Sequence, residues 1–184
     1  MTKQSDPKDE LVVHLPAMRA FAMSLTRNSA IADDLVQDTV VKAWSNLDKF
    51  KQGTNLRAWL FTILRNTFYS HHRKRRREVE DPEGIMADKL SRKPDHDGRL
   101  ALDDFKSAFA QLTAEQREAL VLVGAEGFSY EEAAEMCGCA VGTIKSRANR
   151  ARKNLAELMH LDDESDLELT DSATLAVVTG PSGA

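Results

Sequence analysis

The sequence is poor in the features that mark secreted, membrane-spanning or disulfide-bonded proteins. Its 184 residues contain only two cysteines, Cys137 and Cys139, which are too few for a disulfide framework. No apolar run is long enough to cross a bilayer, and the polar, acidic start MTKQSDPKDE is not expected to act as a secretory signal. These absences predict a cytoplasmic protein without a membrane segment.

Groupings of residues that carry out chemistry are missing as well. The five histidines are scattered, no nucleophile–base–acid set is recognisable, and no glycine-rich loop is suited to cradle a phosphate. Cys137 and Cys139 lack a second cysteine pair or a well-spaced histidine, so we interpret them as small hydrophobic residues rather than metal ligands. We therefore expect no enzyme activity, no metal, no cofactor and no small-molecule substrate.

The distribution of glycine and proline predicts an all-α protein with two domains. These residues gather in 82–98 and near the C-terminus, whereas the segments between carry helical periodicity and no convincing strand alternation. We predict one small helical domain at 10–77 and a second at 105–161. A flexible acidic linker, 78–104, joins them, and 162–184 form a disordered acidic tail.

Charge is segregated along the chain, although the net charge is only −4. Residues 1–77 hold 14 Lys/Arg against 7 Asp/Glu, whereas 78–104 hold 4 against 9. This predicts an anion-binding face on the first domain, beside acidic segments that mask it or meet other partners. Because phosphate neutralisation supplies most non-specific affinity, the isolated chain is expected to bind DNA weakly until a larger partner holds both domains.

The second expected helix of the first domain has two distinct faces. The apolar residues expected to face the core are Leu35, Val36, Val40, Ala43, Trp44 and Leu47. Asp34, Gln37 and Asp38 lie outside this stripe and form an acidic, exposed patch.

The third expected helix, NLRAWLFTILRNTFYSHHRKRRR (55–77), carries cationic and aromatic residues at every fourth position. These are Arg57, Phe61, Arg65, Tyr69 and Arg73. Cations and aromatic faces along one stripe hold single-stranded nucleic acid with little sequence preference. Asn55, just before the helix, is placed to read the edge of an unstacked base. The alternative is a core role, which we assign to Phe68 and favour for Trp59, while Phe61 fits either role.

The second domain has the local signals of a helix-turn-helix. Thr113 with Gln116, and Ser129 with Glu132, have the spacing of capping boxes that start helices. Gly138 supplies the tight turn, and a helix follows from about Val141. Its inward residues are Ile144, Ala148, Ala151 and Leu155, and its outer face carries Lys145, Ser146, Arg147, Asn149, Arg150, Arg152 and Lys153. Arginine and asparagine are suited to read bases in a major groove, although a solvated basic face is the plainer alternative.

Three blocks together identify a family resemblance. They are DDLVQDTVVKAW (33–44), GTNLRAWLFTILRN (53–66) and GFSYEEAAEMCGCAVGTIKSRANRAR (127–152), in this order within about residues 10–160. In content and spacing they resemble the extracytoplasmic-function (ECF) sigma factors, small two-domain initiators of bacterial transcription. Within that family the sequence looks most like the general-stress-response subgroup.

The resemblance implies a partner for each surface. Asp34, Gln37 and Asp38 match the helix that docks on the β′ clamp of core RNA polymerase, and the second domain of such proteins meets the β flap. The residues expected at minus-ten DNA are Asn55, Arg57, Phe61, Arg65, Asn66, Tyr69 and Arg73. Those expected at minus-thirty-five DNA are Thr143, Lys145, Ser146, Arg147, Asn149 and Arg150. Promoter DNA and an anti-sigma factor are thus implied partners, and Ser70 departs from the aspartate that many members carry.

Two other functions remain open from the sequence alone. A sigma-like decoy that titrates an anti-sigma factor would need neither the basic recognition face nor the RKRRR run. A plain helix-turn-helix regulator accounts for the second domain but leaves the stripe at 55–77 and the acidic patch at 33–38 without a purpose. An enzyme that acts on nucleic acid fits the residues least well.

Overall fold

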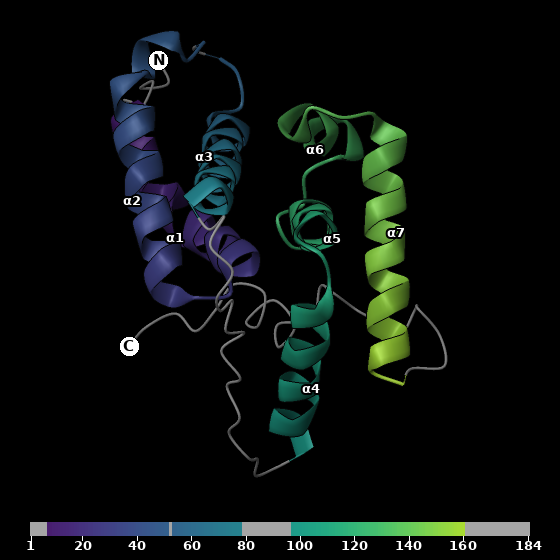
Figure 1. The fold of residues 1–184 in the computed structure, drawn as a ribbon. Helices are drawn as coiled ribbons and strands as arrows, with labels where there is room; N and C mark the ends of the chain where they lie inside the picture. Colours follow the sequence, from purple (N-terminus) through teal and green to yellow (C-terminus); the bar gives the residue numbers. More distant parts are fainter. Residues whose placement is uncertain (1–6, 52, 79–96, 161–184) are drawn as a thin grey trace.

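The computed structural model describes residues 7–51, 53–78 and 97–160, and the regular structure in these ranges is entirely helical (Figure 1). The elements are α1 (Pro7–Thr26), α2 (Ser29–Ser45), the short 3₁₀ helix η1 (Leu47–Lys49), α3 (Leu56–Glu78), α4 (Asp97–Gln111), α5 (Ala114–Leu120), the π-helical turn η2 (Val121–Ala125), α6 (Tyr130–Cys137) and α7 (Val141–Leu158). The predicted all-α fold class is confirmed. The predicted tail and most of the predicted linker lie outside the described residues.

The first domain is a bundle of α1, α2 and α3 around a buried apolar core. Phe21, Leu35 and Leu64, one from each helix, are almost completely buried. The chain reverses between α1 and α2 at Asn28, whose side-chain oxygen accepts a hydrogen bond from the Ile31 amide at 3.0 Å and caps α2. Local capping therefore fixes the turn, and the apolar stripes of three amphipathic helices fix the packing.

The second domain confirms the predicted helix-turn-helix. Both capping boxes form, one at Thr113 and one at Ser129. Gly138 adopts the left-handed conformation with φ 62°, which a side chain would strain. The four predicted inward residues of α7, Ile144, Ala148, Ala151 and Leu155, are all buried. Ala140 stands at the N-cap of α7, and its methyl side chain has no polar atom that could cap the helix.

Two sequence expectations are corrected by the fold. Helix α4 begins at Asp97, so the last eight residues that we placed in the linker are helical. Trp44 does not face the core, because 53% of its surface is exposed. The apolar stripe on α2 is broader than the surface that α1 and α3 cover. The sequence does not show which of its residues stay at the surface, and in the structure Trp44 is one of them.

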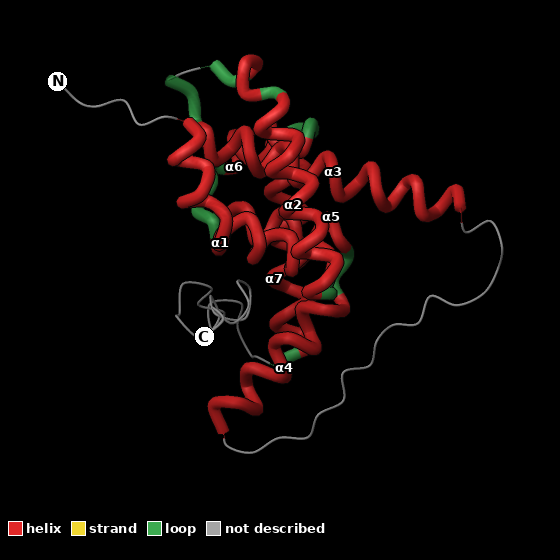
Figure 2. Tube along the Cα trace, turned by 90° about the vertical axis from the view of Figure 1, so that its left-hand side faces the viewer, coloured by secondary structure: helices red, strands yellow, loops and turns green. Residues whose placement is uncertain are grey.

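The two domains lie side by side (Figures 1 and 2). Buried residues from both domains form one apolar cluster. Helix α3 packs on α6, and α1 packs on α5. The ring of Phe61 stacks on Phe21 at 5.1 Å within its own domain and meets the edge of Phe128 from the other domain at 5.3 Å. The relative placement of the domains, which the sequence does not indicate, is therefore a closed arrangement.

Candidate nucleic-acid and polymerase interface

Helix α7 presents a basic face to solvent. Lys145, Asn149 and Arg150 are exposed, and Thr143, Ser146 and Arg147 are partly exposed around them, on the side opposite the buried stripe. The ammonium group of Lys145 lies 5.5 Å from the centre of the Tyr130 ring, close enough for a cation–π contact. The predicted minus-thirty-five residues thus share one accessible face of a straight helix that follows a tight turn.

Helix α2 presents an exposed face that is both acidic and apolar. Asp34, Gln37 and Asp38 are exposed, as expected. Helical spacing extends the same face to Val41 and Trp44, which are also exposed. The sequence analysis placed Trp44 in the core and made no assignment for Val41. A face that combines carboxylates with an exposed indole is typical of a protein-binding surface, where aromatic side chains supply much of the affinity.

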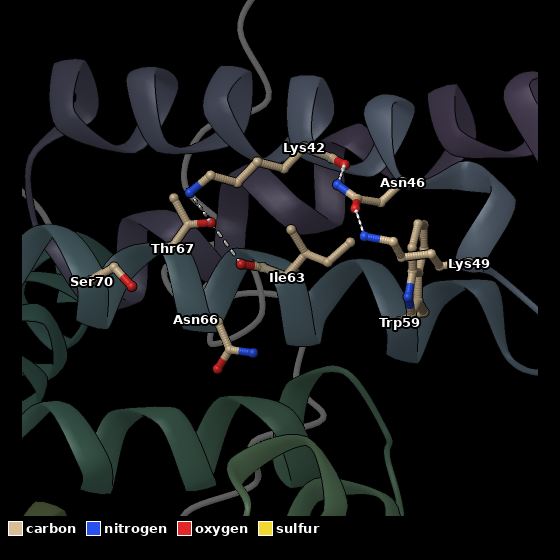
Figure 3. A pocket seen from close by; sticks show the side chains of 8 residues that line it. All are labelled: Lys42, Asn46, Lys49, Trp59, Ile63, Asn66, Thr67 and Ser70. Atoms are coloured by element: carbon tan, nitrogen blue, oxygen red, sulfur yellow. Dashed lines mark hydrogen bonds between the residues drawn. The ribbon is translucent and has the colours of Figure 1, made fainter.

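A pocket of about 350 Å³ lies between α2 and α3 (Figure 3). Its lining residues are Lys42, Asn46, Lys49, Trp59, Ile63, Asn66, Thr67 and Ser70. Of these, the sequence analysis had assigned only Asn66 to DNA. The remaining residues come from two separate helices and the η1 turn, so only the fold brings them together.

Hydrogen bonds hold the cations at the pocket rim in place. The Lys42 Nζ donates to Thr67 Oγ1 at 3.1 Å, which joins α2 to α3. The Lys49 Nζ donates to Asn46 Oδ1 at 2.6 Å. Asn66 points away from this network and its amide is exposed (Figure 3). The pocket therefore combines fixed positive charge, an aromatic wall and an amide that can pair with a base edge.

Asn55 makes two side-chain contacts within this structure, and its role at an unstacked base stays a prediction. Its side-chain oxygen accepts a hydrogen bond from the Ala58 amide at 3.1 Å, so it caps the start of α3. Its side-chain nitrogen donates to Glu132 Oε1 of the second domain at 3.2 Å. Hydrogen bonds from Ser129 hold the pKa of Glu132 below its usual value, and the hydrogen bond from the Asn55 amide adds a smaller effect in the same direction. Both ends of the Asn55 amide are thus occupied in this arrangement.

Arg57 and Phe61 also contact the second domain instead of solvent. The Arg57 guanidinium forms an ion pair with Glu126 and lies 4.6 Å from the centre of the Phe128 ring. Phe61 is completely buried, so the expected stacking of its ring on a base is not possible in this arrangement. Phe61, which fitted either role in the sequence, is a core residue here, because its ring packs against Phe21, Phe128 and the Arg57 guanidinium.

Arg65 and Tyr69 converge on a buried carboxylate. Arg65 Nε lies 2.7 Å from Glu118 Oε1, and the Tyr69 hydroxyl donates to Glu118 Oε2 at 3.3 Å. The Glu118 side chain is completely buried, and this burial raises its pKa. Burial also raises the pKa of the neighbouring Cys137 thiol to about 12. Arg73, two turns beyond Arg65 along α3, is exposed.

Arg117 makes an interdomain contact that nothing in the sequence indicated. It is buried, and its guanidinium donates to the carbonyls of Ser24 at 2.7 Å and Leu25 at 3.3 Å, at the end of α1. Another hydrogen bond reaches the Leu112 carbonyl of its own domain. Burial, followed by the nearby charge of Arg27, lowers the pKa of Arg117 to about 10. An arginine in a predicted amphipathic helix is ordinarily assigned to solvent, so its role depends on the domain packing.

Within residues 7–51, 53–78 and 97–160, no three His, Cys, Asp or Glu side chains are grouped in a way that could hold a metal ion. None of the helices in this part of the chain is long and apolar enough to span a membrane.

A two-domain helical chain with a three-helix bundle in one half and a helix-turn-helix in the other has the architecture of a sigma factor. The sequence pattern of sigma-70 region 2 matches residues 11–78, and that of sigma-70 region 4 matches residues 102–155. The chain is 52% identical to the "ECF RNA polymerase sigma factor EcfG" of Rhodopseudomonas palustris, over 96% of both chains. This protein belongs to the ECF sigma factors of RNA polymerase.

Further relatives and solved structures agree with this family. The chain is 38% identical to the "ECF RNA polymerase sigma factor SigC" of Mycobacterium tuberculosis over 72% of each chain. Among solved structures, it matches the sigma factor RpoE of Bartonella quintana, in complex with the anti-sigma factor NepR. That match has a TM-score of 0.75 and 56% identity, and it covers 85% of this chain and 98% of the other. The chain thus directs RNA polymerase to promoters as a sigma factor.

Proposed function

We propose that the two domains divide promoter recognition, with residues 10–77 binding core polymerase and minus-ten DNA, and residues 105–161 binding minus-thirty-five DNA. The observation that carries this division is the pocket between α2 and α3. Its volume of about 350 Å³ falls within the usual range for sites of small organic groups. A single unstacked base, with its sugar and phosphate, is a ligand of that class.

The chemistry of the pocket favours a base extruded from opened DNA. The indole of Trp59 offers a stacking surface, and the exposed amide of Asn66 offers both a donor and an acceptor to a base edge. Lys42 and Lys49 supply positive charge for the adjoining phosphates. The basic end of α3, including Arg73, continues from this pocket and extends the path for the strand.

The exposed face of α2 is proposed as the docking site for the β′ clamp. Asp34 and Asp38 provide charge that steers association, and Trp44 provides the apolar contact that persists after docking. The face of α7 with Lys145 and Arg150 is proposed to enter the major groove, while its domain meets the β flap. The polymerase catalyses RNA synthesis, so we assign no enzymatic step to this chain. Its partnership with the polymerase implies a cytoplasmic location.

We further propose that the target genes belong to a stress response and that an anti-sigma factor controls this chain. The motifs resemble the general-stress-response subgroup, and the similar sigma factor RpoE is described in complex with the anti-sigma factor NepR. A decoy function, in which the chain only titrates such an inhibitor, gains no support from the accessible basic face of α7.

Reconstituted transcription on unselected genomic fragments tests this proposal. The purified chain is added to sigma-free core polymerase with fragments of the encoding genome, and the 5′ ends of the transcripts are mapped. We expect discrete start sites preceded by common minus-ten and minus-thirty-five elements. Binding to core polymerase without any specific transcript would contradict promoter recognition and would favour the decoy.

A pocket variant tests the minus-ten assignment. Asn66→Ala is expected to lower the rate of promoter opening about fivefold or more, because a well-placed side-chain contact to a base edge contributes about 1–3 kcal/mol. Fluorescence of 2-aminopurine placed in the minus-ten element reports opening. Gln111→Ala, which removes an exposed amide at the end of α4, is the matched control and should open promoters normally. If both variants open promoters at the same rate, the pocket between α2 and α3 does not bind the minus-ten element.

A further inference from the structure

We propose that the acidic segment 162–171 folds back along α7 and covers its cations, so that the free chain competes with duplex DNA for its own helix-turn-helix. The acids of this segment are Asp162, Asp163, Glu164, Asp166, Glu168 and Asp171, and it has no lysine or arginine. The segment lies outside the described residues, but its charge and its reach from the end of α7 indicate the surface that it fits. This inference rests on the proposed function of α7 as the helix that enters the major groove.

Helix α7 carries positive charge that its own acids do not balance. Its five cations are Lys145, Arg147, Arg150, Arg152 and Lys153, and all of them are exposed or partly exposed. The helix has a single acid, Glu157, so its net charge is +4. Glu157 lies 3.9 Å from Lys153, and the other four cations have no acid partner among the described residues. These cations therefore offer a site for a flexible anionic segment as well as for DNA.

The end of α7 brings the acidic segment within reach of these cations. His160, just after the helix, has φ 55°, a left-handed conformation that turns the chain off the helix axis. Arg150 lies ten positions before His160, which corresponds to about 15 Å of helical rise. An extended chain covers that distance in about five residues. Asp166 and Glu168 can therefore reach the middle of α7, where Arg147 and Arg150 lie.

The basic end of α3 is the main competing site for the same segment. Its residues 73–77 are all cationic and exposed. That end belongs to the first domain, however, whereas the acidic segment is attached directly to the end of α7. A short tether gives a high effective concentration, which falls as the chain between two sites becomes longer. Attachment therefore favours the cations of α7 over those of α3.

The contact is also suited to yield to promoter DNA. Ion pairs between exposed side chains are individually weak. The segment, with six acids in ten residues, offers about one charge per 5–6 Å when extended, whereas duplex DNA offers about one per 1.7 Å of its axis. A promoter that the polymerase holds beside α7 can therefore displace the segment. The free chain, without that help, keeps its own acids on α7.

Carbodiimide cross-linking of the full chain tests where the segment lies. The reagent joins a carboxylate to a lysine amine in contact with it, and mass spectrometry identifies the linked peptides. In a mixture of normal and isotope-labelled protein, we expect residues 162–171 to be linked to Lys145 and Lys153 of the same chain. A link to Lys74 would place the segment on α3, and a link between differently labelled chains would place it on a second copy. Absence of the link to Lys145 within one chain overturns the proposal, whichever other lysine is reached.

A charge-neutral variant of the full chain tests the competition. The tail variant changes three acids to their amides: Glu164→Gln, Asp166→Asn and Glu168→Gln. The matched control has the same net charge and changes three exposed acids elsewhere: Asp48→Asn, Asp103→Asn and Asp104→Asn. Fluorescence anisotropy measures the affinity of each protein for a duplex with the mapped minus-thirty-five element and for a duplex of scrambled sequence.

We expect the tail variant to bind both duplexes about fivefold more tightly than the wild type at low ionic strength, because removal of the competitor raises the fraction of chains with α7 uncovered. The gain should be equal for the two duplexes, since the segment covers the helix whatever the DNA sequence. It should also shrink as added salt screens the contact. An unchanged affinity overturns the proposal, and so does an equal gain in the control.

Failure of this inference is distinguishable from failure of the proposed function. If transcription by the wild-type holoenzyme depends on the minus-thirty-five element but the tail variant binds duplex DNA no better, only the competition is wrong. If the holoenzyme transcribes equally well from a promoter with a scrambled minus-thirty-five element, the groove-binding role of α7 is wrong, and the inference falls with it.

Discussion

The guanidinium of Arg117 caps a helix of the other domain: its Nε lies 2.7 Å from the carbonyl oxygen of Ser24, 93 residues away in the sequence. The last carbonyls of α1 have no partner within the helix, so a buried donor is needed once the domains pack together. Because the donor comes from α5, the carbonyls of Ser24 and Leu25 receive these hydrogen bonds only in the closed arrangement.

Arg117→Met is therefore expected to favour separation of the domains. Loss of hydrogen bonds from a charged donor costs about 1.5–3 kcal/mol, and the buried carbonyls regain water only if the interface opens. Small-angle scattering should show a larger radius of gyration, and thermal unfolding should begin at a lower temperature. Arg76→Met, at the exposed end of α3, is the control and should match the wild type. A compact Arg117→Met protein with normal thermal stability would contradict the assigned role.

The two cysteines are expected to differ strongly in reactivity. Cys137 is only 7% exposed, and burial raises its pKa to about 12, so very little reactive thiolate is present at pH 8. Cys139 is more accessible. Alkylation with iodoacetamide, followed by mass spectrometry of peptides, should modify Cys139 at least about 100-fold faster.

A single-thiol variant checks this assignment. Cys139→Ser should leave a protein that is alkylated only slowly in its native state and rapidly after denaturation in urea. Rapid native alkylation of that variant would show that the α6 end of the interface is open in solution.

Local features of this fold could be predicted from the sequence, whereas contacts between the domains could not. The capping boxes at Thr113 and Ser129, and the turn at Gly138, depend on residues within four positions of one another, and all three form. Glu118 instead receives the Tyr69 hydroxyl from 49 residues away. No periodicity distinguishes an acid that faces water from one that faces another domain.

The candidate site shows the same division. The basic face of α7 follows from helical spacing, because its buried side is defined by small and apolar residues of the same helix. The sequence left Phe61 open and wrongly placed Trp44 in the core, since an aromatic ring suits a core, a base or a protein partner equally well. The structure places Phe61 in the core and Trp44 at the surface, and only the packing of neighbouring helices decides between them.

Trp44→Ala is expected to weaken binding to core polymerase. Truncation of an exposed aromatic residue at the centre of a protein interface typically costs about 2 kcal/mol or more, which corresponds to about 30-fold in affinity. Titration of labelled core enzyme measures the dissociation constant. Val13→Ala, which shortens a well-exposed apolar side chain on α1, is the matched control. If both variants bind as the wild type does, the clamp does not dock on this face of α2.

Lys145→Ala and Arg150→Ala are expected to impair promoter recognition without loss of polymerase binding. Both side chains are exposed on α7, far from the acidic face of α2. A bidentate contact to a guanine is worth about 1–3 kcal/mol of discrimination, so its removal should relax preference at one base pair. A phosphate contact should instead weaken all duplexes alike and reduce the slope of affinity against salt concentration by about 1.

Holoenzyme binding to promoter variants at several salt concentrations separates these two roles for each residue. We expect Arg150→Ala to show the base-specific pattern, because arginine presents a planar pair of donors that matches a guanine edge. Lys145, whose ammonium group rests against the Tyr130 ring, is expected to show the phosphate pattern, because a single charged point lacks that fork. Loss of core binding by either variant would contradict the separation of the two surfaces, because α7 would then contribute to docking as well as to DNA recognition.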